Sequence, residues 1–121
     1  MSRILIIDDD DQMRMMLKQT LERAGYEVID APDGDKGIQL MRETSADLVI
    51  TDLIMPEKDG METVIELKRE FPDIKIIAVS GGSRAIDPRD YLHYATQAGA
   101  MKTFTKPFDP KEILEAIIEL L

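Results

Sequence analysis

The sequence predicts an α/β domain with a doubly wound, five-stranded parallel sheet and helices on both of its faces. Short apolar runs alternate with amphipathic stretches five times along the 121 residues, and this alternation is typical of a parallel sheet covered on both sides. Glycine, proline and aspartate stand between the segments, where caps and turns need them. The length suits one domain over residues 1–121, and no linker or long repeat divides it.

Each expected element has its own signal. The strands are the apolar runs at residues 4–7, 27–29, 48–50, 74–79 and 101–104. The helices show apolar residues three or four positions apart, among them Met13, Leu17 and Leu21, Ile38 and Met41, Val64 and Leu67, and Ile113 and Ile117. Gly25 and Gly99 are expected to end helices. Asp87-Pro88 and Asp109-Pro110 are expected to begin them, with an acidic N-cap and proline in the first turn.

Composition excludes several classes of protein. Charged residues make up 32% of the chain and apolar residues 44%, which is typical of a globular protein, and the formal net charge is -9. A chain this acidic is not expected to bind nucleic acid or an anionic membrane directly, because both are polyanions. The absence of cysteine excludes disulfides and thiolate chemistry. The apolar run near the N-terminus is too short for a signal peptide or a membrane span, so a cytoplasmic protein is expected.

Polar residues gather where the predicted strands end. Asp8 and Asp9 follow the first strand, Asp52 the third, Ser80 the fourth and Lys106 the fifth. Ligands of open α/β sheets bind at the carboxyl ends of the strands. Converging carboxylates repel each other unless a cation lies between them, and oxygen ligands suit Mg²⁺. A lysine and a hydroxyl can bind the remaining oxygens of a phosphoryl group, so the pattern indicates phosphoryl transfer to a carboxylate.

Simpler roles compete with this interpretation for single residues. An acid after a strand is often only a helix N-cap, and that is the role expected for Asp10 or Asp11. Ser80 comes before two glycines and could simply be a loop residue. Lys106 comes before a proline and could be a solvated side chain. Their occurrence together at one sheet edge favours a shared site.

Several short motifs occur in the chain in a fixed order. Together they make essentially the whole chain resemble the receiver domains of two-component response regulators, the CheY-like superfamily. The matching segments are Ile4 to Asp10, Asp47 to Pro56 with Asp59-Gly60, Ile76 to Ser80, Ala98 to Ala100, and Phe104 to Phe108. The resemblance implies a flavodoxin-like (βα)5 three-layer sandwich with strand order 2-1-3-4-5. It further implies a signalling switch rather than an enzyme with a separate substrate.

The resemblance also implies roles at the metal and phosphoryl sites. Asp52 would accept the phosphoryl group from a phosphohistidine of a sensor histidine kinase or a phosphotransfer protein. Asp9 would bind Mg²⁺ directly and Asp8 through water, with Asp52 and the main-chain carbonyl of Ile54 as further ligands. Lys106 would pair with a phosphoryl oxygen.

The switch is assigned by the same resemblance. The Ser80 hydroxyl would move to another phosphoryl oxygen, and Phe104 would turn into the vacated space. The surface of the fourth helix, fifth strand and fifth helix would then repack and be read by a downstream protein or a fused output domain. A cis bond is expected between Lys106 and Pro107. A phosphorylation-dependent homodimer is compatible with the resemblance.

Two features depart from the family pattern. The stretch between Ser80 and Lys106 is longer than in familiar members, and the excess lies in residues 81–86, which predicts an extended loop and a shortened or displaced fourth helix. Ile54 and Gly82 occupy positions that often tune loss of the phosphoryl group. Neither can place a polar side chain near an attacking water, so slow to intermediate self-dephosphorylation is expected.

Three other functions share parts of the pattern. Asp8-x-Asp10 after a strand also occurs in haloacid-dehalogenase-type phosphatases, but Gln12 stands where their motif has threonine or valine. A flavodoxin-like cofactor binder would need a phosphate loop where this chain has acids. A pseudo-receiver would only dock to a partner, yet all the charged residues of the reaction are present.

His93 is expected to be a surface residue of the fourth helix rather than a phosphate carrier.

Overall fold

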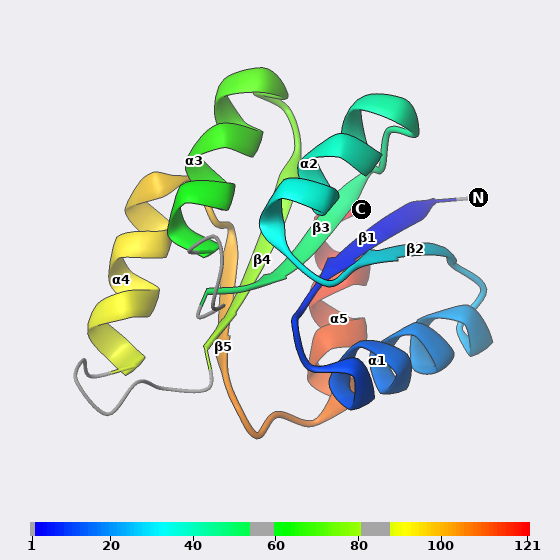
Figure 1. The fold of residues 1–121 in the computed structure, drawn as a ribbon. Coiled ribbons are helices and arrows are strands. Elements are labelled where there is room, and N and C mark those ends of the chain that lie inside the picture. The colour runs from blue at the N-terminus through cyan, green and yellow to red at the C-terminus, as the bar shows by residue number, and fades with distance from the viewer. Residues whose placement is uncertain (1, 54–59, 81–87) are drawn as a thin grey trace.

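Five parallel strands in the order β2-β1-β3-β4-β5 form the centre of the molecule (Figure 1). The computed structural model describes residues 2–53, 60–80 and 88–121, and it describes only the backbone of 88–92. The strands are β1 (Arg3–Ile7), β2 (Glu27–Ala31), β3 (Leu48–Asp52), β4 (Lys75–Ser80) and β5 (Lys102–Thr105). The predicted fold class and strand order are both confirmed.

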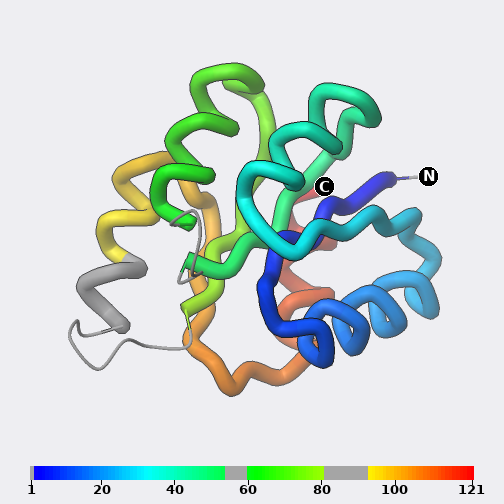
Figure 2. The backbone as a smooth tube through the Cα atoms, viewed as in Figure 1, coloured from blue at the N-terminus to red at the C-terminus, as the bar shows by residue number. Residues whose placement is uncertain are grey.

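Five helices cover the two faces of this sheet. They are α1 (Asp11–Arg23), α2 (Gly34–Glu43), α3 (Gly60–Glu70), α4 (Pro88–Ala98) and α5 (Pro110–Leu120). One core layer joins the sheet to α2, α3 and α4, and the other joins it to α1 and α5. The tube view shows the same separation, with α1 and α5 on the opposite side of the sheet from α2 and α3 (Figure 2).

The central strands are apolar at successive positions because both of their faces are covered. In β1, Leu5 and Ile7 pack in the core with α2 and α3, while Ile4 and Ile6 pack in the core with α1 and α5. All four side chains are fully buried. A slip of one residue would draw a charged neighbour, Arg3 or Asp8, into the apolar layers, and this cost fixes the register of the strand.

Aspartate side chains begin three of the helices. Asp10 accepts hydrogen bonds from the backbone N–H groups of Gln12 and Met13, and Asp33 and Asp109 cap α2 and α5 in the same way. Of the two acids considered for the first cap, Asp10 is the N-cap and Asp11 is the first helical residue. These caps satisfy backbone donors that lack partners inside the helix.

Apart from β1, the strands run one or two residues further toward their carboxyl ends than the apolar runs predicted. Asp52 and Ser80 are the last residues of β3 and β4 rather than the first residues beyond them. Backbone pairing continues there, because Asp52 lies opposite Val79 and the Lys106 N–H donates to the Ser80 carbonyl at 2.8 Å. The ladder thus extends into polar residues, which ties them to the rigid sheet.

The fourth helix begins at Pro88, as the Asp87-Pro88 pair predicted. The extended loop expected at residues 81–86 lies outside the described part of the chain. Within the described ranges, none of the helices is both long and apolar enough to cross a bilayer.

Candidate phosphoryl and metal site

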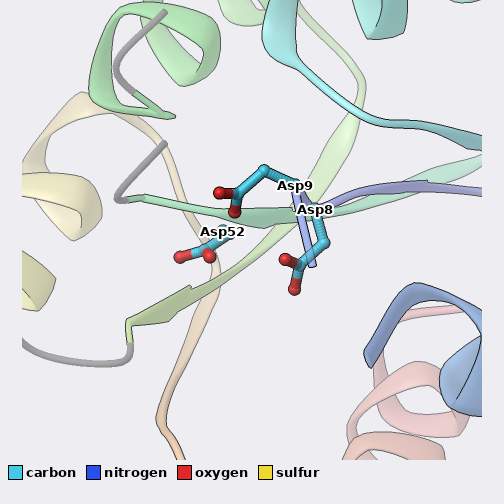
Figure 3. Close-up of side chains that lie close together, drawn as sticks. All are labelled: Asp8, Asp9 and Asp52. Carbon is cyan, nitrogen blue, oxygen red and sulfur yellow. The ribbon is translucent and has the colours of Figure 1, made fainter. Parts of the chain in front are cut away.

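Three carboxylates meet at the carboxyl edge of the sheet (Figure 3). Asp8 and Asp9 follow β1, and Asp52 ends the neighbouring strand β3. Each offers one oxygen, and these oxygens all lie within 4.8 Å of one another. Asp8 and Asp52 are buried, whereas Asp9 is exposed. Such an all-oxygen set that is open on one side fits Mg²⁺, which keeps part of its water shell.

Lys106 supplies a cation to the two buried carboxylates. Its Nζ lies 3.1 Å from Asp8 Oδ2 and 3.1 Å from Asp52 Oδ2. Lys106 follows β5, so these bonds connect that edge strand with the ends of β1 and β3. The ammonium therefore offsets the repulsion between acids that the fold brings together.

Burial dominates the protonation behaviour of Asp8. Desolvation raises the pKa of Asp8 despite the hydrogen bond from the Asp10 N–H and the charge of Lys106, both of which lower it. Burial lowers the pKa of Lys106, but the charges of Asp52 and Asp8 outweigh this and leave it raised. The lysine is consequently charged at neutral pH, and its partners hold it in that state.

Replacing Lys106 should therefore destabilise the metal-free protein. Lys106→Met is expected to lower the free energy of unfolding by about 2 kcal/mol, because it leaves two buried carboxylates without their cation. The raised pKa means that the wild-type advantage is present below pH 10.5 and is lost as pH rises through the folded-state pKa. Urea denaturation at neutral pH with and without Mg²⁺ measures the loss and its rescue, since Mg²⁺ should restore most of it. The same denaturation repeated at increasing alkaline pH measures the pH dependence.

Lys102→Met is the matched control for this measurement. Lys102 pairs with Glu119 at 2.9 Å, but that glutamate is exposed. Such surface pairs contribute at most about 1 kcal/mol. Equal losses for the two variants, or no rescue of Lys106→Met by Mg²⁺, would contradict the assigned role of Lys106 as the cation of the acidic site.

A close backbone approach fixes the position of Asp52. The Gly60 N–H donates to the Leu53 carbonyl at 2.9 Å, which places the first turn of α3 against the end of β3. A Cβ at Gly60 would lie 2.1 Å from the Asp52 carbonyl oxygen. The Thr51 hydroxyl donates to the same oxygen at 3.0 Å. Gly60 is therefore required for this packing. The Asp59-Gly60 motif in the sequence includes this glycine, but the sequence alone does not show why a glycine is needed there.

Ser80 is fully buried at the end of β4. This strand lies between β3, which ends at Asp52, and β5, which Lys106 follows. The place of Ser80 in β4 puts its side chain on the same face as Ala78, which packs with α3 and α4. The predicted site residues Asp8, Asp9, Asp52, Ser80 and Lys106 thus share one edge of the sheet. Ile54 and its carbonyl lie outside the described residues.

The structure corrects the expectation for Phe104. Phe104 lies opposite Val79 and packs with it in the core formed by α1 and α5, where its ring centroid is 6.4 Å from that of Phe108. Because side chains alternate along a strand, Phe104 and Ser80 lie on opposite faces of the sheet. Phe104 cannot enter space next to Ser80 without crossing the sheet. Thr103 is the β5 residue opposite Ala78.

Two smaller predictions can be checked directly. The peptide bond between Lys106 and Pro107 is cis, as expected. His93 is exposed on α4, with its ring centroid 6.1 Å from that of Tyr94, as expected for a surface residue.

Sequence reasoning missed the arginine that joins this site to its surroundings. Arg14 of α1 donates to the main-chain carbonyl of Asp8 at 2.8 Å, and it also forms ion pairs with Asp11 and Asp30. The Asp11 to Arg14 spacing is a signal for a pair on one helix face. The contact with Asp8 had no signal, because it depends on how the loop after β1 turns.

The fold and this arrangement define an α/β domain with an acidic site, held by a lysine and accompanied by a serine, at the carboxyl edge of its sheet. The family model described as "response regulator receiver domain" matches residues 4–118. The chain belongs to this family, whose members act in two-component phosphorelay signal transduction.

Full-length relatives and a solved structure agree with this assignment. The chain is 39% identical over 120 residues to the chemotaxis protein CheY of Bacillus subtilis, covering 98% of this chain and 97% of the relative. It is 37% identical over 116 residues to CheY of Thermotoga maritima, covering 95% and 93%. The crystal structure of response regulator TrrA from Thermotoga maritima in complex with Mg(2+)-BeF has a TM-score of 0.86 at 33% identity, with 100% of both chains covered.

Proposed function

We propose that residues 1–121 form one receiver domain that takes a phosphoryl group onto the Asp52 carboxylate. The observation that carries the proposal is the double contact of Lys106 Nζ, at 3.1 Å from both Asp8 and Asp52. It brings the acceptor carboxylate, a second acid and a cation together at one sheet edge. This is the combination that transfer to an anionic nucleophile requires.

Asp8, Asp9 and Asp52 would hold Mg²⁺, with the Ile54 carbonyl as a further ligand. The bound ion would neutralise charge on the carboxylates and on the transferred group. An Asp52 oxygen would attack phosphorus while the bond from phosphorus to the histidine nitrogen of the donor breaks, and the released imidazole would take a proton from water. Lys106 would bind one oxygen of the transferred group and the Ser80 hydroxyl another.

The readout would begin on the face of the sheet that carries Ser80. Movement of Ser80 toward the phosphoryl group would displace the backbone after β4 and change the packing of α4 on β4 and β5. The surface of α4, β5 and α5 would then be read by a downstream protein or a fused output domain. In place of the role predicted for Phe104, we propose that this side chain only packs the opposite core.

A sensor histidine kinase or a phosphotransfer protein would be the phosphoryl donor, in the cytoplasm. The net charge of -9 supports protein partners over direct contact with nucleic acid or a membrane. Phosphorylation could also be coupled to formation of a homodimer.

The domain would act as a switch that assists its own phosphorylation and dephosphorylation, with slow to intermediate loss of the phosphoryl group from Asp52. A phosphoryl half-life of seconds would contradict that last point.

A chemical trapping experiment tests the acceptor directly. The protein is incubated with acetyl phosphate and Mg²⁺, the acyl phosphate is reduced with borohydride, and the modified residue is located by peptide mass spectrometry. Modification at Asp52 that is lost in EDTA is expected. Modification of another carboxylate, or none under conditions that saturate Mg²⁺, would overturn the proposal.

Phe104→Ala tests the revised role of the aromatic residue. Phe104 is half-buried against the α1 and α5 core, so truncation should lower the free energy of unfolding by about 2 kcal/mol. Phosphorylation of Asp52, and the chemical-shift changes that follow it near Ser80 in NMR spectra, should persist. Loss of those shift changes in a folded Phe104→Ala protein would restore the original switch assignment.

A further inference from the structure

Arg14 connects three elements next to the acidic site. Its Nη1 donates to the Asp8 carbonyl at 2.8 Å, its Nε to Asp30 of β2 at 2.8 Å, and its Nη2 to Asp11 of α1 at 2.6 Å. Its side chain is only 16% exposed. A planar guanidinium can satisfy three acceptors in fixed directions, which an ammonium cannot do.

These contacts act on the backbone that carries the acidic pair. The Asp8 carboxylate is held on one side by the Asp10 N–H, at 2.9 Å, and on the other by Lys106. The Asp8 N–H donates to the Ala31 carbonyl at 3.2 Å. The bond from Arg14 to the Asp8 carbonyl fixes the remaining polar group of this residue. It therefore orients the peptide unit between Asp8 and Asp9.

Asp9 depends on that peptide unit for its direction. Asp9 is exposed, and its carboxylate comes within 4.8 Å of those of Asp8 and Asp52. Rotation of the peptide between Asp8 and Asp9 would move the exposed carboxylate relative to the two buried ones. Asp11 and Asp30 together offset the charges of Arg14 and of Lys18, which lies 3.6 Å from Asp30. The arginine can therefore hold this loop without adding a free positive charge beside a cation site.

We infer that Arg14 is a positioning residue for the acidic pair, which sets Mg²⁺ affinity by fixing the Asp8–Asp9 peptide through its bond to the Asp8 carbonyl. The inference rests on the proposed Mg²⁺ site. Arg14 touches neither the ion nor the phosphoryl group in this scheme; it acts through the backbone that directs the ligands.

The sign of the effect of Arg14→Met separates positioning from simple electrostatics. Removing a positive charge leaves Asp11 without this partner and leaves Asp30 with Lys18, 3.6 Å away. The region becomes more negative, which alone would strengthen cation binding. Loss of positioning should instead weaken Mg²⁺ binding, by roughly tenfold as for other residues that orient metal ligands. The dissociation constant is measured by isothermal calorimetry with Mg²⁺ and no phosphoryl donor. Unchanged or tighter binding by folded Arg14→Met would overturn the inference.

Two further variants keep the test decisive. Arg14→Lys retains the charge but not the three-way geometry, so its Mg²⁺ binding should remain weakened. Full recovery would show that the guanidinium geometry is not needed and would contradict the positioning role. Asp30→Ala removes one acceptor that orients Arg14 and should weaken binding by a smaller factor. That effect should vanish when Arg14 is already Met. Additive effects in this double-mutant cycle would contradict a shared mechanism.

Arg42→Met is the matched control. Arg42 forms a two-pronged pair with Glu70, at 2.9 Å from each oxygen, between the C-terminal turns of α2 and α3. Loss of that pair should leave the Mg²⁺ dissociation constant unchanged. If the wild-type protein itself binds no Mg²⁺, the proposed site fails. If the wild type binds and the Arg14 variants bind equally well, only the role of Arg14 fails.

Discussion

Asp52→Asn should abolish phosphorylation by acetyl phosphate while leaving the protein folded. The amide has the shape of the carboxylate but no anionic oxygen to attack phosphorus. Lys106 keeps its 3.1 Å bond to Asp8, so neither the lysine nor Asp8 is left without a partner. The free energy of unfolding should consequently change by no more than about 1 kcal/mol. Gel retardation of the phosphorylated protein and urea denaturation measure the two quantities.

Asp33→Asn is the control for this substitution. Asp33 is another aspartate at the carboxyl edge, but its side chain caps α2 by accepting from the Lys36 N–H at 2.9 Å. Asparagine caps helices about as well as aspartate, so both stability and phosphorylation should be retained. Phosphorylation of Asp52→Asn at the wild-type rate would move the acceptor to another residue and would overturn the site assignment.

Gly60→Ala should be the most destabilising of the single substitutions considered. The added Cβ would lie 2.1 Å from the Asp52 carbonyl oxygen and 2.4 Å from the Leu53 Cα, both of which are backbone atoms that cannot rotate away. The helix must shift to relieve the overlap, at a cost of about 3 kcal/mol. The displacement would also disturb Asp52, so the Mg²⁺ affinity should fall together with the melting temperature.

Gly25→Ala separates crowding from backbone conformation. Gly25 has a φ of +97°, but nothing lies within 4 Å of a Cβ built there. Its substitution should cost about 1 kcal/mol through strain alone and should leave Mg²⁺ binding unchanged. A Gly60→Ala protein as stable as Gly25→Ala would show that α3 yields easily at its first turn, contrary to the packing described.

Much of the fold could be predicted because its signals are local or periodic. Apolar runs, aspartate caps and glycine stops gave the order of elements, and parallel strands bring their carboxyl ends to one edge. Asp8, Asp9, Asp52, Ser80 and Lys106 could therefore be placed together without coordinates. Their catalytic and switching roles, by contrast, are assigned from the ordered motifs, because position alone does not distinguish an acceptor from a metal ligand.

The remaining features depend on long-range register. Phe104 was placed beside Ser80 in the expected mechanism, although β4 pairs Val79 with Phe104 and Ser80 with Thr105. A difference of one position along a strand moves a side chain to the other face, and a short motif does not state which residue faces which layer. Arg14 was missed for a related reason, because one of its three acceptors is a carbonyl that only the folded loop exposes.

The position of Lys106 in the acidic site determines whether the folded state depends on a bound metal ion. Because Lys106 bridges Asp8 and Asp52, these acids have a counter-ion within the protein itself, and folding does not require a metal ion. Zinc-finger domains are the opposite case, since they unfold when the metal is removed. Under the proposed mechanism, depletion of magnesium would stop phosphorylation of Asp52 and leave the protein folded. The same molecules could then be phosphorylated again when the ion returned.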